Sequence, residues 1–301
     1  MGTPAAAVPT LEKILNDGHE VVAVYSQPDR PSGRGNKISF SPVKQFAVDK
    51  GLPVFQPVKI KIPETIGTFR EHGADVAVVV AYGRILPENF LSAYPKGAIN
   101  VHFSLLPKYR GAAPVNWAIV NGEARTGVTT MKMDAGLDTG GILLKRETAI
   151  GETETTPELM ERLSMLGADL LSETLAMHDE LVPQAQAESL ATFAPIMRKE
   201  DGLIDWKSGA EDITNRVRGF QPFPTAFTSY QGKKLTLWKV GALDSFPGAP
   251  GEIVEAKGDN LVVSCGSETL NIYELQIEGK RRMSVRDFLN GTKVQVGEVL
   301  G

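Results

Sequence analysis

The sequence holds a single cysteine, Cys265, among 301 residues, so no internal disulfide can form. This excludes a disulfide-stapled secreted scaffold and fits a protein of the reducing cytoplasm. Four histidines and one cysteine are too few and too scattered for a structural zinc site, and we expect no metal. The longest apolar run, residues 76–82, is far shorter than the roughly 20 residues that span a bilayer. No basic segment followed by an apolar stretch opens the chain, so we expect neither a signal peptide nor a membrane partner.

Several sequence signatures of common enzyme classes are also missing. No phosphate-binding loop and no dinucleotide fingerprint occurs, so ATP and nicotinamide chemistry have no anchor. No nucleophile elbow and no zinc-protease helix occurs either. Cys265 lies in a predicted strand with no histidine nearby, which predicts a buried, inert thiol rather than a nucleophile.

The composition that is present is ordinary for a globular protein, with 42% hydrophobic and 23% charged residues. The net charge of −4 hides an asymmetry. Residues 29–61 carry seven Lys/Arg, Arg34 and Lys37 among them, against two acids. A basic loop on an acidic body is a plausible place to meet a polyanion, although a solvated lysine-rich face has the same pattern.

The first half of the chain alternates short apolar runs with helical patterns. Alternating strands and helices with β-branched strands predict an α/β fold with a doubly wound, mostly parallel, Rossmann-like sheet. Ser41 followed by Pro42 predicts a helix start, because serine is a good N-cap and proline suits the first helical position. The expected strands cover residues 19–26, 52–55, 75–82, 98–103, 127–133 and 142–146, and the expected helices cover 8–17, 41–50, 63–72, 87–93, 114–121 and 155–180.

The second half has a different character. Proline, glutamine and glycine break the periodicity over residues 182–202, which predicts a connector. Short strands with glycine turns follow, typical of a small β-barrel or sandwich, and the family resemblance described below favours the barrel, in an OB-like form. We therefore expect a catalytic domain at 1–182, a linker at 183–203 and a C-terminal β-barrel domain at 204–301. Its strands are expected at 226–231, 235–240, 251–256, 261–265 and 269–277, with helices at 209–218 and 284–289.

The start of the chain does not fit this scheme. A doubly wound sheet normally begins with a strand, whereas Met1-Gly2-Thr3-Pro4 reads as the turn that follows one. Because loss of a central strand leaves backbone groups unpaired, we expect a missing upstream segment rather than a sheet without its first strand.

The most informative stretch is Asn-Val-His-Phe-Ser-Leu-Leu-Pro, which starts at Asn100. Strand side chains alternate, so Asn100 and His102 point to one face while Val101 points into the packing. Both lie at the carboxyl end of an expected parallel strand, where α/β sheets bind ligands. A lone histidine after a strand is more often structural, but an asparagine two residues before it favours a site.

Two further loops belong to the same edge of the sheet. Residues 133–141 follow the next expected strand and contain three glycines, which let backbone approach a ligand, and Asp138. We expect Asp138 to face His102, where a carboxylate orients an imidazole and stabilises its charged form. Ala81-Tyr82-Gly83-Arg84-Ile85-Leu86 ends the expected strand 75–82 and offers backbone groups to a flat heterocycle. An Asp-Gly turn and a plain strand–helix loop are the simpler alternatives.

Together these loops resemble the folate-dependent formyltransferases, and among them the branch that acts on methionyl-tRNA. The resemblance covers nearly the whole chain, and its motifs are specific in combination. It rests on Gly2-Thr3-Pro4, Gln27-Pro28-Asp29-Arg30-Pro31, Gly33-Arg34-Gly35, Ser41-Pro42-Val43-Lys44, Tyr109-Arg110-Gly111-Ala112-Ala113-Pro114, Lys199-Glu200-Asp201-Gly202 and Pro222-Phe223-Pro224.

The resemblance implies transfer of a formyl group from 10-formyltetrahydrofolate to the amino group of methionine on initiator tRNA, in translation initiation. Asn100, His102 and Asp138 match the catalytic trio of the family. The amine would attack the formyl carbon, and Asn100 with protonated His102 would donate hydrogen bonds to the tetrahedral oxyanion. Asp138 would keep His102 charged and help move the amine proton toward the folate nitrogen.

The same resemblance assigns the binding residues. Folate, the formyl-donor substrate, is the implied cofactor, no metal is required, and we expect a monomer. The residues matched to the folate site are Ser104, Leu105, Leu106 and Pro107, with Arg84, Ile85 and Leu86 on the pterin side. The residues matched or assigned to tRNA are Arg34, Lys37, Lys207, Arg216 and Arg218. One departure from the family pattern is Phe103 after the histidine, which should affect packing because it points away from His102's face.

Four other readings compete. A sugar-nucleotide formyltransferase would share the trio and the folate loops but should lack the basic loop around Arg34. A glycinamide ribonucleotide formyltransferase would lack the last hundred residues. A 10-formyltetrahydrofolate hydrolase would use water as acceptor. An RNA-binding protein with a retired catalytic domain is the reading from a different class, and the intact trio argues against it.

Overall fold

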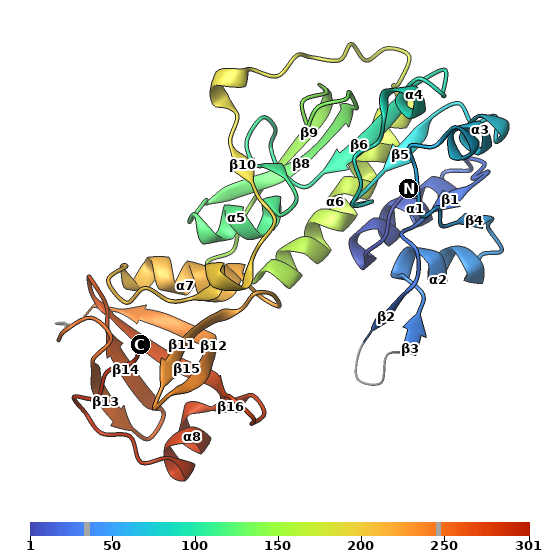
Figure 1. Cartoon of the computed structure of the whole chain (residues 1–301). Coiled ribbons are helices and arrows are strands. Elements are labelled where there is room, and N and C mark those ends of the chain that lie inside the picture. The colour runs from blue at the N-terminus through green and yellow to red at the C-terminus, as the bar shows by residue number, and fades with distance from the viewer. Residues whose placement is uncertain (33–36, 245–247) are drawn as a thin grey trace. The chain divides into compact units, whose positions relative to one another are not determined.

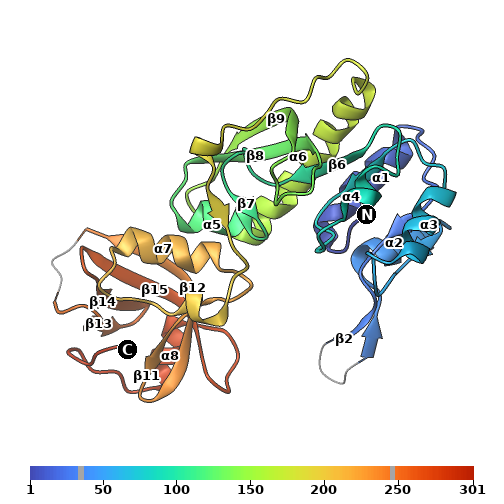
Figure 2. The same cartoon turned by 45° about the horizontal axis from the view of Figure 1, so that its top comes forward.

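The computed structural model describes residues 1–32, 37–244 and 248–301. It divides into two compact units (Figures 1 and 2). Unit 1 comprises Met1–Pro114, Arg125–Ala149 and Met160–Pro195, and unit 2 comprises Val115–Ala124, Ile150–Leu159 and Ile196–Gly301. Of the predicted linker, residues 183–195 belong to unit 1 and residues 196–203 to unit 2. The domain limits at 182 and 204 stay a prediction.

Unit 1 is built on a four-stranded sheet in the order β5 (Ala77–Val79), β6 (Ala98–His102), β8 (Arg125–Lys132), β9 (Gly141–Ala149). β5 and β6 run parallel, and β1 (Val24–Tyr25) pairs in parallel with β4 (Val54–Phe55). The predicted α/β class with parallel strands is confirmed. β8 and β9 differ from the expected direction, because they form an antiparallel hairpin. Only eight residues connect them, whereas a parallel crossover needs a dozen or more.

The remaining elements of unit 1 surround these strands. Ser41 caps α2 as predicted, because its hydroxyl accepts the Lys44 N–H at 3.2 Å and Pro42 begins the helix. β7 (Arg110–Gly111) pairs in parallel with β10 (Phe193–Ala194), which holds the predicted connector against the unit. The other elements are η1 (Ala5–Ala7), α1 (Val8–Asn16), β2 (Arg30–Ser32), β3 (Lys37–Ser39), α2 (Pro42–Asp49), α3 (Pro63–Glu71), α4 (Glu88–Leu91), α5 (Pro114–Val120), α6 (Thr156–Ala176) and η2 (Glu188–Leu190).

Helix α6 packs against one face of β6 and β8 in unit 1 (Figure 1). Gly167 makes the contact, because a Cβ there would lie 2.9 Å from Val101 Cγ1 and 3.4 Å from Phe103 Cε1. Val101 and Phe103 are both buried on this face. Strand alternation therefore turns Asn100 and His102 to the opposite face, and Phe103 contributes to packing as predicted.

The first residues of the chain lie between β1 and β5. Gly2 pairs in parallel with Val80, and its N–H donates to Tyr25 O at 2.9 Å. Only Val24–Tyr25 of the strand predicted at 19–26 is assigned as strand, since residues 19–23 have no paired neighbour in the described chain.

Unit 2 carries an antiparallel sheet in the order β11 (Ala226–Tyr230), β12 (Lys233–Leu243), β15 (Thr269–Ile277), β14 (Asn260–Ser264), β13 (Ile253–Lys257). The last residues bond to both ends of this order, because Leu300 N–H donates to Gly251 O and Gly301 N–H to Ser229 O. The sheet thus curves back on itself. Cys265 is buried in its core, as predicted, and this burial raises the pKa of its thiol to about 12. The remaining elements are β16 (Met283–Ser284), η3 (Lys199–Gly202), α7 (Ala210–Gly219) and α8 (Val285–Gly291).

Candidate active site

The carboxyl end of β6 presents two buried polar side chains, Asn100 and His102. They are 8% and 6% exposed. Both are held in register by main-chain pairing, since Asn100 pairs with Val79 on one side and His102 with Thr129 on the other. The strand therefore fixes an amide and an imidazole on one face, two residues apart, as the sequence predicted.

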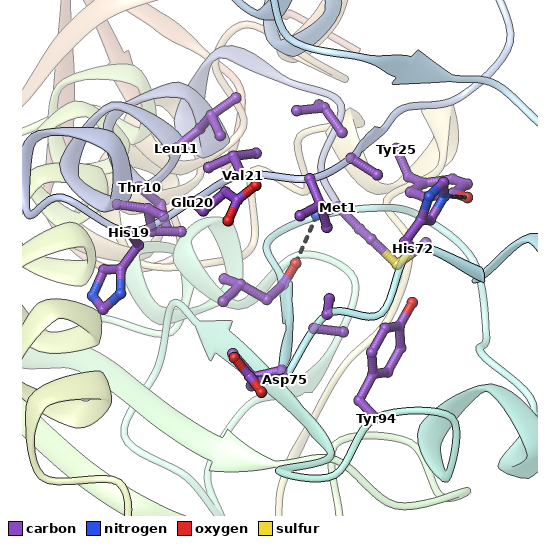
Figure 3. A pocket seen from close by; sticks show the side chains of 18 of the residues that line it. Met1, Thr10, Leu11, His19, Glu20, Val21, Tyr25, His72, Asp75 and Tyr94 are labelled. Atoms are coloured by element: carbon purple, nitrogen blue, oxygen red, sulfur yellow. Dashed lines mark hydrogen bonds between the residues drawn. The ribbon is translucent and has the colours of Figure 1, made fainter. Parts of the chain in front are cut away.

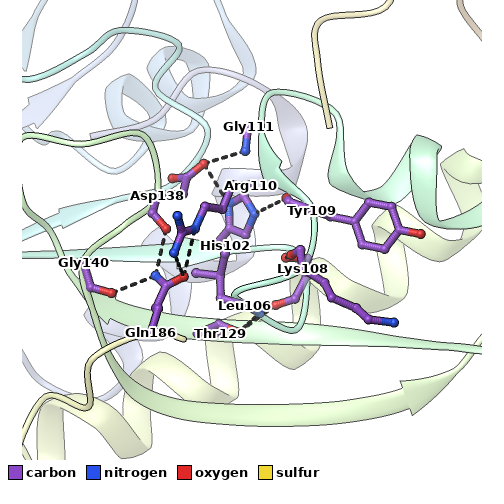
Figure 4. A network of polar contacts seen from close by, with 11 residues as sticks. His102, Leu106, Lys108, Tyr109, Arg110, Gly111, Thr129, Asp138, Gly140 and Gln186 are labelled. Atoms are coloured by element: carbon purple, nitrogen blue, oxygen red, sulfur yellow. Dashed lines mark hydrogen bonds and ion pairs between the residues drawn. The ribbon is translucent and has the colours of Figure 1, made fainter. Parts of the chain in front are cut away.

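Each ring nitrogen of His102 faces an oxygen that can only accept (Figure 4). Nε2 lies 2.9 Å from the Tyr109 carbonyl oxygen, and Nδ1 lies 3.7 Å from Asp138 Oδ2. A neutral imidazole has one N–H and can satisfy only one of these acceptors. The Tyr109 oxygen, at hydrogen-bond distance, accepts from Nε2, while the Asp138 carboxylate lies farther away on the Nδ1 side.

Asp138 comes from the loop between β8 and β9 and has an unusual backbone conformation. Its φ of 52° lies in the left-handed region, which is uncommon for a residue other than glycine and frequent at functional sites. Its Oδ2 accepts the Gly111 N–H at 2.8 Å. β8 runs antiparallel to β6, so the loop has to fold back to bring Asp138 beside His102. The pairing of these two residues agrees with the sequence, but the route differs from the two parallel strand ends that we expected.

A side chain that sequence reasoning missed fixes this loop. Gln186 Nε2 donates to the backbone oxygens of Asp138 and Gly140, both at 2.8 Å, and its Oε1 accepts from Arg110 Nε at 3.0 Å and Nη2 at 2.9 Å (Figure 4). The orientation of the amide follows from its partners, because carbonyls require donors and a guanidinium requires an acceptor. Gln186 lies in the stretch interpreted as a connector, where no periodicity or motif marks it.

Arg110 completes the arrangement from β7. Its side chain is only 2% exposed, and it forms a two-bond ion pair with Glu188 at 3.0 and 2.8 Å. The hydrogen bond to Glu188 raises the pKa of Arg110, and the reciprocal bond lowers the pKa of Glu188. The buried guanidinium thus has fixed partners on both sides.

The stretch from Ser104 to Pro107 leaves the sheet directly after β6. Thr129 holds it from β8, because its hydroxyl donates to Ser104 O at 2.7 Å and accepts the Leu106 N–H at 3.1 Å. The side chains of Ser104 and Leu106 are fully buried, Leu106 in a cluster with other apolar groups of the sheet. Leu105 and Pro107 are half-buried and are the side chains of this stretch that can reach a ligand.

The loop after β5 is held from two sides. Arg84 donates from Nε to Gln27 Oε1 at 2.9 Å and from Nη1 to Val58 O at 2.7 Å. Leu86 is buried in the core, whereas Ile85 is 66% exposed. Arg84 and Ile85 line an open groove of about 470 Å³ together with Lys59 and Lys61. Of the three predicted pterin-side residues, Arg84 and Ile85 face open space and Leu86 does not.

Comparison with known proteins identifies the family of the chain. The family model described as "Formyl transferase" matches residues 1–175, and the model described as "Formyl transferase, C-terminal domain" matches residues 196–293. The chain belongs to the formyltransferase family. The two matches cover both units, so the family relation extends to the antiparallel sheet of unit 2 as well as to the site in unit 1.

Two full-length relatives carry the same name. The methionyl-tRNA formyltransferase of Geobacter metallireducens is 49% identical over 303 residues, covering 100% of this chain and 97% of that protein. The methionyl-tRNA formyltransferase of Citrifermentans bemidjiense is 52% identical, with 100% and 95% covered. At this level of identity the chain is similar to these proteins from end to end.

Solved structures of lower identity share the fold. The sugar 3N-formyltransferase WlaRD aligns with a TM-score of 0.67 at 19% identity, covering 93% of this chain and 97% of WlaRD. HypX from Aquifex aeolicus aligns with a TM-score of 0.59 at 17% identity, and this chain spans 47% of HypX. These likenesses establish the formyltransferase fold and nothing about the acceptor.

The residues assigned to tRNA differ in their surroundings. Arg34 lies outside the described residues, and Lys37 belongs to β3. Lys207 is exposed in unit 2. Arg216 donates to Asp201 O and lies over the Phe220 ring, while Arg218 donates to Asn215 Oδ1 and burial lowers its pKa. In unit 2 the two arginines therefore stabilise the fold through these contacts.

Among the described residues, no group of three or more His, Cys, Asp or Glu side chains is arranged to hold a metal ion. No helix in the described part of the chain has the length and the apolar character needed to cross a membrane.

Proposed function

We propose that the protein transfers a formyl group from 10-formyltetrahydrofolate to the amino group of methionine carried by initiator tRNA. The observation that carries the proposal is the His102–Asp138 pair at the end of β6, in a chain about half identical over its full length to proteins of that name. The sugar formyltransferases are only distantly similar, at 19% identity for WlaRD. The product would start protein synthesis.

The proposed chemistry is an acyl transfer between two nitrogens. The neutral methionine amine attacks the formyl carbon, a new N–C bond forms, and the carbonyl oxygen becomes an oxyanion. The bond from that carbon to the folate nitrogen then breaks. The attacking nitrogen loses one proton and the departing folate nitrogen gains one, so charge and atoms balance.

His102 and Asn100 are proposed to stabilise the oxyanion. Nε2–H of His102 points away from Asp138 and has the Tyr109 oxygen as its partner. We expect the developing oxyanion to share or take over this donor, with the Asn100 amide on the same strand face as the second donor. Asp138 offsets the charge of the imidazolium from the other side and receives no proton permanently.

The donor and the tRNA are proposed to use the residues that the resemblance assigns. Leu105 and Pro107 on one loop, and Arg84 and Ile85 on the other, are the members of the folate set with accessible side chains. Ser104, Leu106 and Leu86 would act by shaping the backbone around them. Arg34 and Lys37 would meet the acceptor end of tRNA, and Lys207, Arg216 and Arg218 its body. The protein would act as a monomer in the cytoplasm and would need no metal.

A direct assay tests the function. The purified protein receives 10-formyltetrahydrofolate and, in parallel, methionyl initiator tRNA, an amino-sugar nucleotide, or neither acceptor. We expect formylmethionyl-tRNA to form and the other two reactions to give only background. Formylation of the sugar nucleotide, or hydrolysis of the donor at the same rate without acceptor, would replace this proposal with one of the competing functions.

A further inference from the structure

The loop between β8 and β9, which carries Asp138, is exposed along most of its length. Residues 134–137, directly before Asp138, are all exposed. Within the loop, Asp134 Oδ1 accepts the Gly136 N–H at 3.0 Å and the Thr139 hydroxyl at 2.6 Å. These bonds shape the turn, but they join the loop only to itself. The place of Asp138 in the site therefore depends on contacts from outside the loop.

Gln186 supplies such a contact from a segment that comes 48 residues later in the chain than Asp138. Its Nε2 donates to the backbone oxygens of Asp138 and Gly140, both at 2.8 Å (Figure 4). The two oxygens lie on either side of Thr139, so one side-chain amide fixes the turn of chain between them. Asp138 has a φ of 52°, in the left-handed region, and the bond to its oxygen holds the peptide group that follows in this uncommon conformation.

The other end of the Gln186 amide is fixed by a buried cation. Oε1 accepts from Arg110 Nε at 3.0 Å and from Nη2 at 2.9 Å. Arg110 is 2% exposed and is paired with Glu188, so the guanidinium is itself held in place. The amide cannot turn over, because its NH₂ group would then face the donors of the guanidinium. Both donor hydrogens of Gln186 are therefore directed at the loop.

The backbone around Gln186 is anchored before and after this residue. Before it, Gln184 exchanges two backbone hydrogen bonds with Ile142 of β9, both at 2.8 Å. After it, β10 pairs in parallel with β7. Gln186 thus reaches the loop from a segment whose position is set by β9 on one side and by β7 on the other.

We infer that Gln186 is a positioning residue, which holds Asp138 beside His102 during formyl transfer. The inference rests on the proposed function. Gln186 does not touch the reacting atoms and acts through Asp138, whose Oδ2 lies 3.7 Å from His102 Nδ1. A neutral amide fits this place, because one end donates to two carbonyl oxygens while the other accepts from a guanidinium. A carboxylate could fill only the second of these roles.

Two substitutions and a matched control measure the role in the reaction. Gln186→Ala should lower kcat roughly 10- to 100-fold with little change in KM for the donor, because a small displacement of Asp138 affects the transfer step and leaves the folate loops in place. Gln186→Glu keeps an acceptor for Arg110 but loses both donors to the loop, so it should be as impaired as alanine. Gln184→Ala, at an exposed glutamine of the same segment, should have normal kinetics.

A double substitution tests whether Gln186 acts through Asp138. In the Asp138→Asn background, Gln186→Ala should lower kcat by a further factor of about two or less, since the carboxylate that Gln186 positions is already gone. A purely structural role of Gln186 predicts instead that the two losses multiply. Multiplied losses would overturn the inference.

Hydrogen exchange at the Gly111 amide reports the place of Asp138 without any turnover. The Gly111 N–H donates to Asp138 Oδ2 at 2.8 Å, whereas the neighbouring amides of Arg110 and Ala112 donate to backbone oxygens of residues 192 and 194. In Gln186→Ala we expect exchange at Gly111 to be roughly fivefold faster or more, with both neighbours unchanged. Faster exchange at all three amides would mean that β10 has separated from β7 and that the role is structural.

The outcomes distinguish this role from the proposed function. If the unsubstituted protein forms no formylmethionyl-tRNA, the proposed function fails, and exchange at Gly111 still decides whether Gln186 holds the loop. If the product forms while Gln186→Ala keeps its kcat, or if exchange at Gly111 stays the same, the positioning role fails. Rescue by Gln186→Glu would also overturn it, because the contact with Arg110 would then be sufficient.

Discussion

The carboxyl end of β6 and the edge of β5 beside Met1 differ in how many hydrogen-bond partners their polar groups have. At β6 the carboxylate of Asp138, the guanidinium of Arg110 and the amide of Gln186 all have partners at hydrogen-bond distance. At the edge of β5 away from β6, Met1 and Gly2 are the backbone partners among the described residues, and a cavity lined by apolar and polar side chains lies beside them (Figure 3). The difference separates a site whose polar groups each have several fixed contacts from a strand edge with few.

The largest effect on kcat is expected from His102, at the carboxyl end of β6. His102→Ala should reduce kcat by about 10³-fold, because it removes an oxyanion donor and the partner of Asp138. Single-turnover formylation of methionyl initiator tRNA measures the loss, and donor binding by fluorescence serves as the control, which should stay within a few-fold. Turnover within tenfold of the unsubstituted enzyme would show that the paired region is structural.

Asp138→Asn should cost about 10²-fold in kcat, somewhat less than His102→Ala. The asparagine can still accept the Gly111 N–H, but it no longer offsets the charge of the imidazolium. The double variant should be little worse than His102→Ala alone, because the two residues act as a unit. Additive losses would contradict the proposed pair.

Arg34→Ala tests the binding of tRNA separately from the transfer step. We expect KM for tRNA to rise roughly tenfold with kcat nearly unchanged, and the slope of log affinity against log salt to fall by about one. Arg125→Ala, an exposed arginine elsewhere in unit 1, should leave both unaltered. An unchanged salt slope would remove Arg34 from the tRNA contacts.

The smallest effect is expected at the Met1 amino group beside β5. It is a change in the free energy of unfolding with pH. The Met1 amino group has an ordinary pKa near 8 when unfolded and about 5 when buried. Between these values the unfolded state binds more protons, so the free energy of unfolding should rise with pH from about 5 to about 8 and then level off. Denaturant titrations at several pH values measure this. A variant with Gly-Ser-Gly-Ser added before Met1 lacks the buried amine and should lose this part of the slope; an identical slope would assign it to other groups.

The sequence was sufficient for the fold class and for the placement of Asn100 and His102 on one face of β6, because strand alternation follows from local patterns. The partnership of His102 with Asp138 was also predicted, but from two parallel strand ends, whereas the loop after the antiparallel β8 provides it. It was not sufficient for the direction of β8 and β9. Their apolar, β-branched residues suit parallel and antiparallel pairing alike, and only the short connection distinguishes the two. The capping of α2 by Ser41 was predictable, since a cap depends on neighbouring residues alone.

Gln186 shows the limit more clearly. Its importance comes from contacts with residues 48 and 46 positions earlier in the chain, and nothing in its own neighbourhood signals them. The buried state of Leu106 and Leu86 was likewise beyond local reading, because both lie in loops that are expected to be exposed. Long-range pairing, such as that of β10 with β7, is what converts an irregular segment into part of a site.

The close approach of α6 at Gly167 has a consequence for how His102 is held. Gly167 has a hydrogen where alanine has a methyl group, and this allows the helix to lie close to β6. A Cβ at this position would lie 2.9 Å from Val101 Cγ1. The contact with α6 therefore fixes the position of β6. Because His102 lies on the opposite face of that strand, the contact also fixes the position of its imidazole. Gly167 takes part in no reaction, but the absence of a side chain there determines where His102 is placed.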